Sequence, residues 1–174
     1  MPTFGPENAT LTVRTKRQGA ASKAGHDLLI EVTSWSATLE FGEDPAGTTV
    51  TLTADPSSLR VLEGTGGMMT LGDDDKAGIA KTIDDEVLKR TPIEFRSTAV
   101  ELSPGGGSGS VTGELELAGR SRPIAFELTA DEDGRITGTA TLKQTDWGMK
   151  PYSALFGTLK VADEVEVEID ARLP

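Results

Sequence analysis

Residues 111–128 read VTGELELAGRSRPIAFEL, and their apolar side chains recur at alternate positions on both sides of a turn. Val111 and Leu115 share one face of the first half, and Ile124 and Phe126 share one face of the second. A period of two is typical of a strand with one buried face. The intervening AGRSRP has the composition of a turn. The stretch therefore predicts an antiparallel β-hairpin with one face in the core.

The same alternation recurs along most of the chain. Further runs of this kind are TLTVRTK, TVTLTAD, SLRVL, PIEFRSTAVEL, RITGTATLKQTDW and DEVEVEIDARL. In LLIEVTSWSATLEF the apolar parity changes between Val32 and Trp35. A strand keeps its buried face only if such a change is absorbed by an extra residue, so a bulge is predicted near Thr33 and Ser34. A second phase change is predicted before Val100.

The segment DDDKAGIAKTIDDEVLKR breaks this alternation. Ile79, Ile83 and Val87 recur at intervals of four, which is helical spacing. Acidic residues at the start and basic residues at the end complement the helix dipole. Because Pro92 prevents continuation, a single amphipathic helix is predicted over residues 74–90.

These patterns predict a mainly β, antiparallel architecture with about eight strands and one amphipathic helix, built as a closed barrel or a sandwich. At 174 residues the chain is expected to form a single domain over residues 1–174. A closed barrel of about eight strands can hold one apolar ligand.

The chain carries 28 acidic and 17 basic side chains, for a formal net charge of -11. That charge repels phosphate backbones and anionic membranes, so nucleic acid is excluded as a predicted partner. The absence of cysteine excludes disulfides and thiolate sites. No stretch is long and apolar enough for an integral membrane segment, and the first residues do not resemble a secretory signal. A cytoplasmic protein is therefore expected.

Five stretches, in order, resemble the YceI-like family of lipocalin-like β-barrels, also described as polyisoprenoid-binding or lipid-binding. They are AGHDLLIEV with the later Trp35, IDDEVL, TPIEFRSTAVEL, VTGELELAGRSRPIAFEL, and LKQTDWGMKP with VADEVEVEIDA. The resemblance covers nearly the whole chain. It implies a barrel whose interior takes a long, apolar, isoprenoid-like lipid or quinone, with the helix bordering the mouth of the cavity.

Alternating apolar residues from separate runs converge only if the sheet closes on itself, and the resemblance adds the step from core to ligand cavity. The ligand-binding residues predicted in this way are Ile30, Trp35, Ile83, Val87, Phe95, Leu115, Phe126, Leu142, Trp147 and Phe156. Ile83 and Val87 are expected near one end. The same side chains would form an ordinary core if the barrel filled its own interior.

His26, the chain's only histidine, stands next to Asp27 at the start of a strand-like run. Neither a second histidine nor a cysteine is available to complete a metal site, so no metal, cofactor or catalytic residue is predicted. The acids at Asp73–Asp75 lack the spacing of a calcium loop. A hydrogen-bonding role at the polar edge of the cavity is predicted for His26.

Three classes of function follow. The leading prediction is non-enzymatic binding, transport or storage of the apolar lipid. The alternatives are a lipid-modifying enzyme that uses His26 with a carboxylate, and a self-filled barrel that acts as a structural or stress-related partner. Homodimer formation is left open.

Overall fold

The structure is a computed structural model, and it describes residues 2–19, 25–44, 47–67, 70–154 and 159–173. The strands of the first half are β1 (Thr3–Phe4), β2 (Ala9–Thr15), β3 (Arg17–Gln18), β4 (Asp27–Val32), β5 (Trp35–Glu40), β6 (Thr49–Ala54) and β7 (Leu59–Thr65). Those of the second half are β8 (Ile93–Leu102), β9 (Ser108–Leu117), β10 (Arg120–Ala130), β11 (Arg135–Lys143), β12 (Ser153–Ala154), β13 (Leu159–Val161) and β14 (Glu164–Arg172). The helical elements are η3 (Pro56–Ser58), α1 (Asp73–Thr82), η4 (Ile83–Val87) and η5 (Gln144–Trp147).

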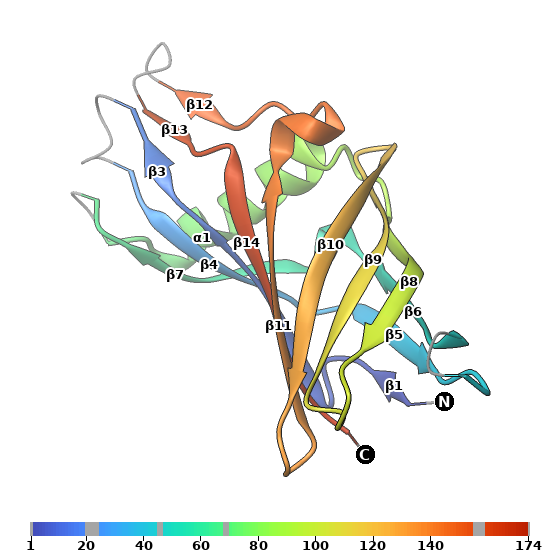
Figure 1. Ribbon diagram of the computed structural model, residues 1–174. Coiled ribbons are helices and arrows are strands. Elements are labelled where there is room, and N and C mark those ends of the chain that lie inside the picture. The colour runs from blue at the N-terminus through green and yellow to red at the C-terminus, as the bar shows by residue number, and fades with distance from the viewer. Residues whose placement is uncertain (1, 20–24, 45–46, 68–69, 155–158, 174) are drawn as a thin grey trace.

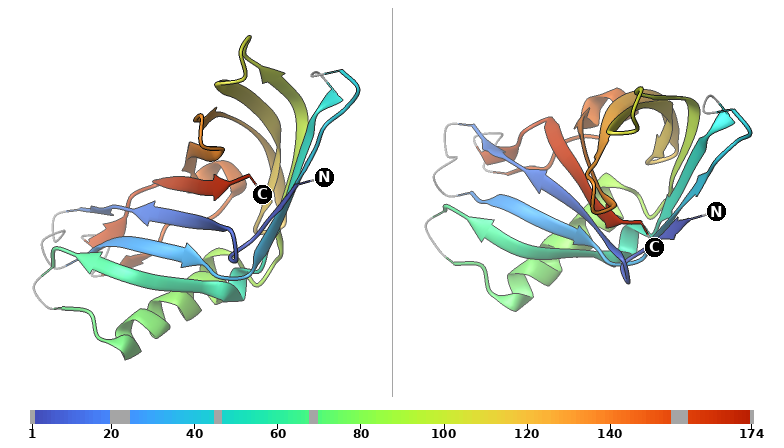
Figure 2. Two further views of the ribbon diagram at one scale, coloured as in Figure 1. Left: turned by 90° about the horizontal axis from the view of Figure 1, so that it is seen from below. Right: turned by 60° about the horizontal axis from the view of Figure 1, so that its bottom comes forward.

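Eleven strands form one antiparallel sheet in the order β1-β5-β6-β8-β9-β10-β11-β14-β2-β4-β7, and β12, β13 and β3 form a small second sheet. The large sheet curls into a half-barrel (Figures 1 and 2). The predicted mainly β, antiparallel, barrel-like architecture with one helix is confirmed. The predicted closure is not, because β1 and β7 stay at the two edges of the sheet. The predicted count of about eight strands is wrong, because the large sheet has eleven in the described residues. The sequence shows nine alternating runs, one of which forms both β4 and β5, and the two-residue β1 is too short to show alternation.

The break between β4 and β5 explains the change of apolar parity there. β4 pairs with β2 and β7, whereas β5 pairs with β1 and β6. The Thr33 N–H donates to the Ser58 carbonyl at 3.0 Å, and the Asp55 N–H donates to the Ser34 carbonyl at 3.0 Å. The predicted bulge at this position is therefore wrong, because the chain leaves one part of the sheet and joins another.

The β9–β10 hairpin confirms the prediction made from residues 111–128. Its two-residue loop has positive φ at both positions, 50° at Ala118 and 82° at Gly119, as a type I′ turn requires. On the other side of β9, the pairing with β8 shifts register between Ser97 and Ala99. This irregularity is the phase change predicted before Val100.

The predicted helix appears as α1, continued by the π-helical turn η4. At its start the Asp75 carboxylate accepts the Gly72 N–H at 3.0 Å, and at its end the Leu88 N–H donates to the Ile83 carbonyl at 2.8 Å. The helix runs beside β7 at the edge of the half-barrel (Figure 2). The helical segment therefore lies where the curled sheet does not close.

Two clusters of buried side chains fill the protein. The larger one involves β8, β9 and β11 and includes Val111, which is 1% exposed, and Trp147. The other gathers around Phe4, Leu11 and Trp35, where β1, β2 and β5 meet. Members of both clusters, among them Leu11 and Phe95, also line a space on the concave face of the sheet that side chains do not fill.

Candidate ligand-binding cavity

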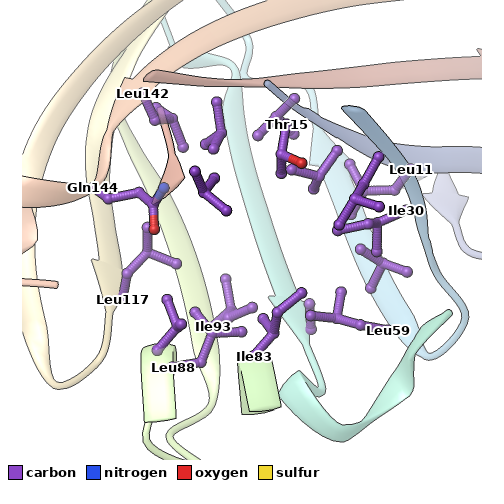
Figure 3. A pocket seen from close by; sticks show the side chains of 18 of the residues that line it. Leu11, Thr15, Ile30, Leu59, Ile83, Leu88, Ile93, Leu117, Leu142 and Gln144 are labelled. Atoms are coloured by element: carbon purple, nitrogen blue, oxygen red, sulfur yellow. The ribbon is translucent and has the colours of Figure 1, made fainter. Parts of the chain in front are cut away.

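A cavity of about 810 Å³ lies between the concave face of the large sheet and the helical segment. Eight strands of the large sheet contribute two or more alternate residues to it, as one face of a pleated strand requires, and β5 and β7 contribute one residue each. Figure 3 shows these side chains converging from several walls on one space. The apolar residues that the sheet places there include Leu11, Val13, Leu28, Ile30, Val50, Leu52, Ile93, Phe95, Leu115, Leu117, Ile124, Phe126, Leu128, Ala140, Leu142, Val165, Val167 and Ile169.

The helical segment provides the remaining wall. Ile79 and Thr82 of α1 line the cavity, followed by Ile83, Val87 and Leu88. Figure 3 places Ile83 and Leu88 at the helical end of the space, close to Ile93 in the same view. The spacing that predicted an amphipathic helix is therefore the spacing that turns its apolar face toward the cavity.

Seven of the ten predicted ligand-binding residues line this cavity: Ile30, Ile83, Val87, Phe95, Leu115, Phe126 and Leu142. The rings of Phe95 and Phe126 pack in a tilted arrangement with centroids 5.6 Å apart. Their role in binding stays a prediction, but the structure brings them together around one space. Phe156 lies outside the described residues.

The two tryptophans do not line the cavity, which corrects their predicted place. Trp147 belongs to η5, is 3% exposed, and donates from Nε1 to the Leu115 carbonyl at 2.8 Å. Trp35 belongs to the cluster at the other end of the sheet and is 6% exposed. It borders a separate hollow together with Pro56 and Asp84. Both indoles therefore serve the packing of the barrel.

His26 lines the cavity near its rim and is half-buried. A side chain at Gly67, where φ is +74°, would place its Cβ 2.5 Å from His26 Nε2, so the imidazole needs glycine there. Asp27 accepts the Arg17 N–H at 2.8 Å through Oδ1. The Arg17 guanidinium in turn donates from Nη1 to the Gly25 carbonyl at 3.1 Å. The neighbours of His26 are thus held by hydrogen bonds, and the role of His26 itself at the polar edge of the cavity stays a prediction.

Two buried polar residues in the cavity wall were not predicted from the sequence. Thr15 is 8% exposed and Gln144 is 7% exposed, and both line the cavity. A signal for them existed. Thr15 continues the inward alternation of Leu11 and Val13, and Gln144 follows Leu142 by two residues.

Charged residues end the helical segment. The Asp85 carboxylate accepts from Arg90 Nε at 2.7 Å and from Lys81 Nζ. The hydrogen bond from Arg90, and then that from Lys81, lower the pKa of Asp85 from 3.8 to about 2. These ion pairs link α1 to the part of the chain that follows η4.

We expect this arrangement to make stability depend on pH in acid. Because the pKa of Asp85 is lower in the folded state, the ion pairs stabilise the fold fully above about pH 4 and are lost as pH falls toward about 2. Asp85→Asn should therefore have a thermal midpoint that changes less with pH in this window. Glu86→Gln, on the exposed side of η4, is the matched control. Equal pH profiles for Asp85→Asn and the parent would contradict the role of Asp85.

Within the described ranges, no group of three or more histidine, aspartate or glutamate side chains is placed to hold a metal ion. In the same part of the chain, no helix has the length and apolarity needed to cross a membrane.

Comparison with known proteins places this architecture. A family model for the YceI-like domain matches residues 5–173. A UPF0312 protein from Pseudomonas putida (strain W619) is 33% identical over 90 residues, 47% of this chain and 46% of that protein. The matched part of the chain therefore spans about half the length of this curated relative.

Solved structures share the fold at low sequence identity. BcnA from Burkholderia cenocepacia superposes with a TM-score of 0.67 and 19% identity, covering 93% of this chain and 94% of that one. A YCEI protein from Campylobacter jejuni gives a TM-score of 0.57 and 16% identity, covering 83% and 84%. Since the family match extends over nearly all of the sequence, the chain belongs to the YceI-like family.

Proposed function

We propose that the protein binds, transports or stores a long, apolar, isoprenoid-like lipid or quinone in the cavity, without catalysing a reaction. The observation that carries this proposal is the cavity itself, about 810 Å³ between the sheet and the helical segment. That volume lies within the range of about 300–1,000 Å³ typical of small-molecule sites. Its walls are mostly Leu, Ile, Val and Phe side chains, which present an apolar surface to an apolar ligand.

The driving force would be the removal of apolar ligand surface from water. Each 100 Å² of such surface contributes about 2.5 kcal/mol before the costs of ordering are subtracted. A flexible ligand loses conformational entropy when it binds, and this loss offsets much of the gain. Affinity therefore depends on how much of the length of the cavity the ligand fills. Shape and apolarity, rather than a single residue, then define the class of ligand.

The two alternative functions have less support. A self-filled barrel would have its inward side chains packed against one another, as protein interiors are, whereas this one encloses a cavity. An enzyme would use His26 with a carboxylate as base. The carboxylate next to it in sequence, Asp27, accepts the Arg17 N–H, which favours a structural use of the pair.

The proposal is tested on the purified protein in two steps. Organic extraction and mass spectrometry identify any lipid that co-purifies, and geranylgeraniol is then titrated by calorimetry. We expect saturable binding of one molecule per chain with a negative heat-capacity change, the mark of apolar burial. No extractable apolar compound, together with no saturable binding of geranylgeraniol, would overturn the proposal.

The proposal also covers domain organisation, location and partners. The carrier is proposed to act as a single domain in the cytoplasm, without nucleic acid or cofactor. Homodimer formation, left open by the sequence, is tested by light scattering at two protein concentrations.

A further inference from the structure

The helical segment is attached to the rest of the protein unevenly along its length. Near its end, Ile83 and Val87 pack against the larger buried cluster, and Leu88 belongs to that cluster and is 7% exposed. Its beginning lacks such support: in the described part of the chain, Leu71 and Ile79 line the cavity but pack against neither cluster. No residue of α1 itself is buried. The end of the segment is therefore anchored, whereas its beginning lies over the cavity.

Contacts with β7 hold the beginning of the segment against the sheet. Lys76 Nζ donates to the Leu62 carbonyl at 3.3 Å. Leu71 packs over Gly64, where an added Cβ would lie 3.2 Å from Leu71 Cγ. β7 is at one edge of the large sheet, and Figure 2 shows α1 alongside it. Because these contacts lie outside the buried clusters, they can break while the clusters stay packed.

Gly78 lies between the part of the helix that contacts β7 and the part that packs on the larger cluster. It is within α1 and lines the cavity. Its backbone is not in the left-handed region, and an added Cβ would meet no atom of the described residues within 4 Å. Neither conformation nor space therefore requires glycine here. Since glycine is among the weakest helix formers, the helix opens most easily at this residue.

We propose that residues 71–77 form a gate, which opens away from β7 about Gly78 and admits the ligand to the cavity. This inference rests on the proposed function and adds the route by which the ligand enters. Opening breaks the two contacts with β7, while Leu88 and the ion pairs of Asp85 hold the end of the segment in place. Because the gate is closed both before and after binding, its opening limits association and dissociation alike.

A reversible crosslink between the gate and β7 tests this inference. The spacing of Gly64 and Leu71 suits a disulfide, whose Cβ atoms are about 3.5–4.5 Å apart, and the chain has no cysteine of its own. Gly64→Cys is combined with Leu71→Cys, and mass spectrometry checks the crosslink. Stopped-flow fluorescence then measures the exchange of N-phenyl-1-naphthylamine. Both rate constants should be at least about tenfold lower in the oxidised than in the reduced form, with the same Kd. The parent with and without reductant controls for the reagents.

Gly78→Ala tests the opening point without a crosslink. Both rate constants should fall about fivefold, the effect of the difference in helix propensity between glycine and alanine, while Kd stays unchanged. Gly107→Ala is the matched control. This glycine lies in the loop between β8 and β9, and an added Cβ there also meets no atom of the described residues within 4 Å. Its substitution should leave both rate constants unchanged.

Equal rates in the oxidised and reduced forms would overturn the gate while leaving the carrier proposal intact. Failure of the two cysteines to form a crosslink would also overturn it, because the gate would then not contact β7 as described. A Gly78→Ala variant with a changed Kd and an unchanged association rate would show that Gly78 only forms part of the cavity wall. If the probe does not bind the parent saturably, the carrier proposal fails and the gate fails with it.

Discussion

Replacing Trp147 with alanine is expected to lower the free energy of unfolding by about 3–5 kcal/mol, a large share of the stability of a small protein. The indole is 3% exposed, and its Nε1 donates to the Leu115 carbonyl at 2.8 Å. Alanine removes the packed ring and its hydrogen bond to the Leu115 carbonyl together, and leaves a cavity. Urea unfolding of Trp147→Ala and the parent, followed by circular dichroism, measures the difference.

Two controls separate packing from aromatic content and from ligand binding. Phe41 is 58% exposed, so Phe41→Ala should change the unfolding free energy by no more than about 0.5 kcal/mol. Trp147→Phe keeps most of the ring and loses the hydrogen bond, so its cost should be smaller than that of Trp147→Ala. Geranylgeraniol affinity should be unchanged in Trp147→Phe, since this residue lies outside the cavity wall. A cost below about 1 kcal/mol for Trp147→Ala would contradict its structural role.

The sequence predicted the long strands because each buries one face over its whole length. Alternation at Val111 and Leu115, and again at Ile124 and Phe126, therefore appeared without any knowledge of strand order. It could not reveal β1, since Thr3–Phe4 is only two residues long. Nor could it separate β4 from β5, because alternation reports which face is buried and not which strands are partners.

The same limit explains the tryptophans. Trp35 has the inward parity of β5 and packs within the second cluster, whereas Ala37, two residues further along β5, also lines the cavity. Trp147 follows β11 in the short turn η5, whose geometry does not continue the period of a strand. The alternation of apolar residues predicts which face of the sheet a side chain lies on. Its position along the barrel axis depends on strand register and on the curvature of the sheet. Only the fold as a whole determines which inward residues meet a cavity and which meet other side chains.

Polar residues on the inward face of a strand also line the cavity, but a pattern of apolar residues alone does not include them. Thr15 and Gln144 both keep the parity of their apolar neighbours, so the sequence contained their position. What it lacked was the burial of Thr15 Oγ1 without a partner in the described chain. Alternation therefore predicts which residues line the cavity, whereas the hydrogen bonding of its polar side chains depends on the fold.

Filling the cavity should weaken binding with little effect on stability. Ala140 lines the cavity from β11, is half-buried and borders the larger cluster. Ala140→Trp should lower the affinity for geranylgeraniol at least about tenfold, which corresponds to about 1.4 kcal/mol. Adding Leu52→Trp from β6 should reduce the length of polyprenol that is accommodated. Calorimetric titration with polyprenols of increasing length measures both effects.

Stability decides between a ligand cavity and a close-packed interior. If the cavity is open, the new indole can extend into it without displacing its neighbours, so Ala140→Trp should change the unfolding free energy by less than about 1 kcal/mol. In a packed core the same insertion costs about 1–3 kcal/mol, because neighbours must shift. Thr141→Trp, on the exposed outer face of the same strand, controls for the added aromatic group and should leave binding unchanged. Loss of stability by Ala140→Trp, in a parent that binds no polyprenol, would favour the self-filled barrel over the carrier.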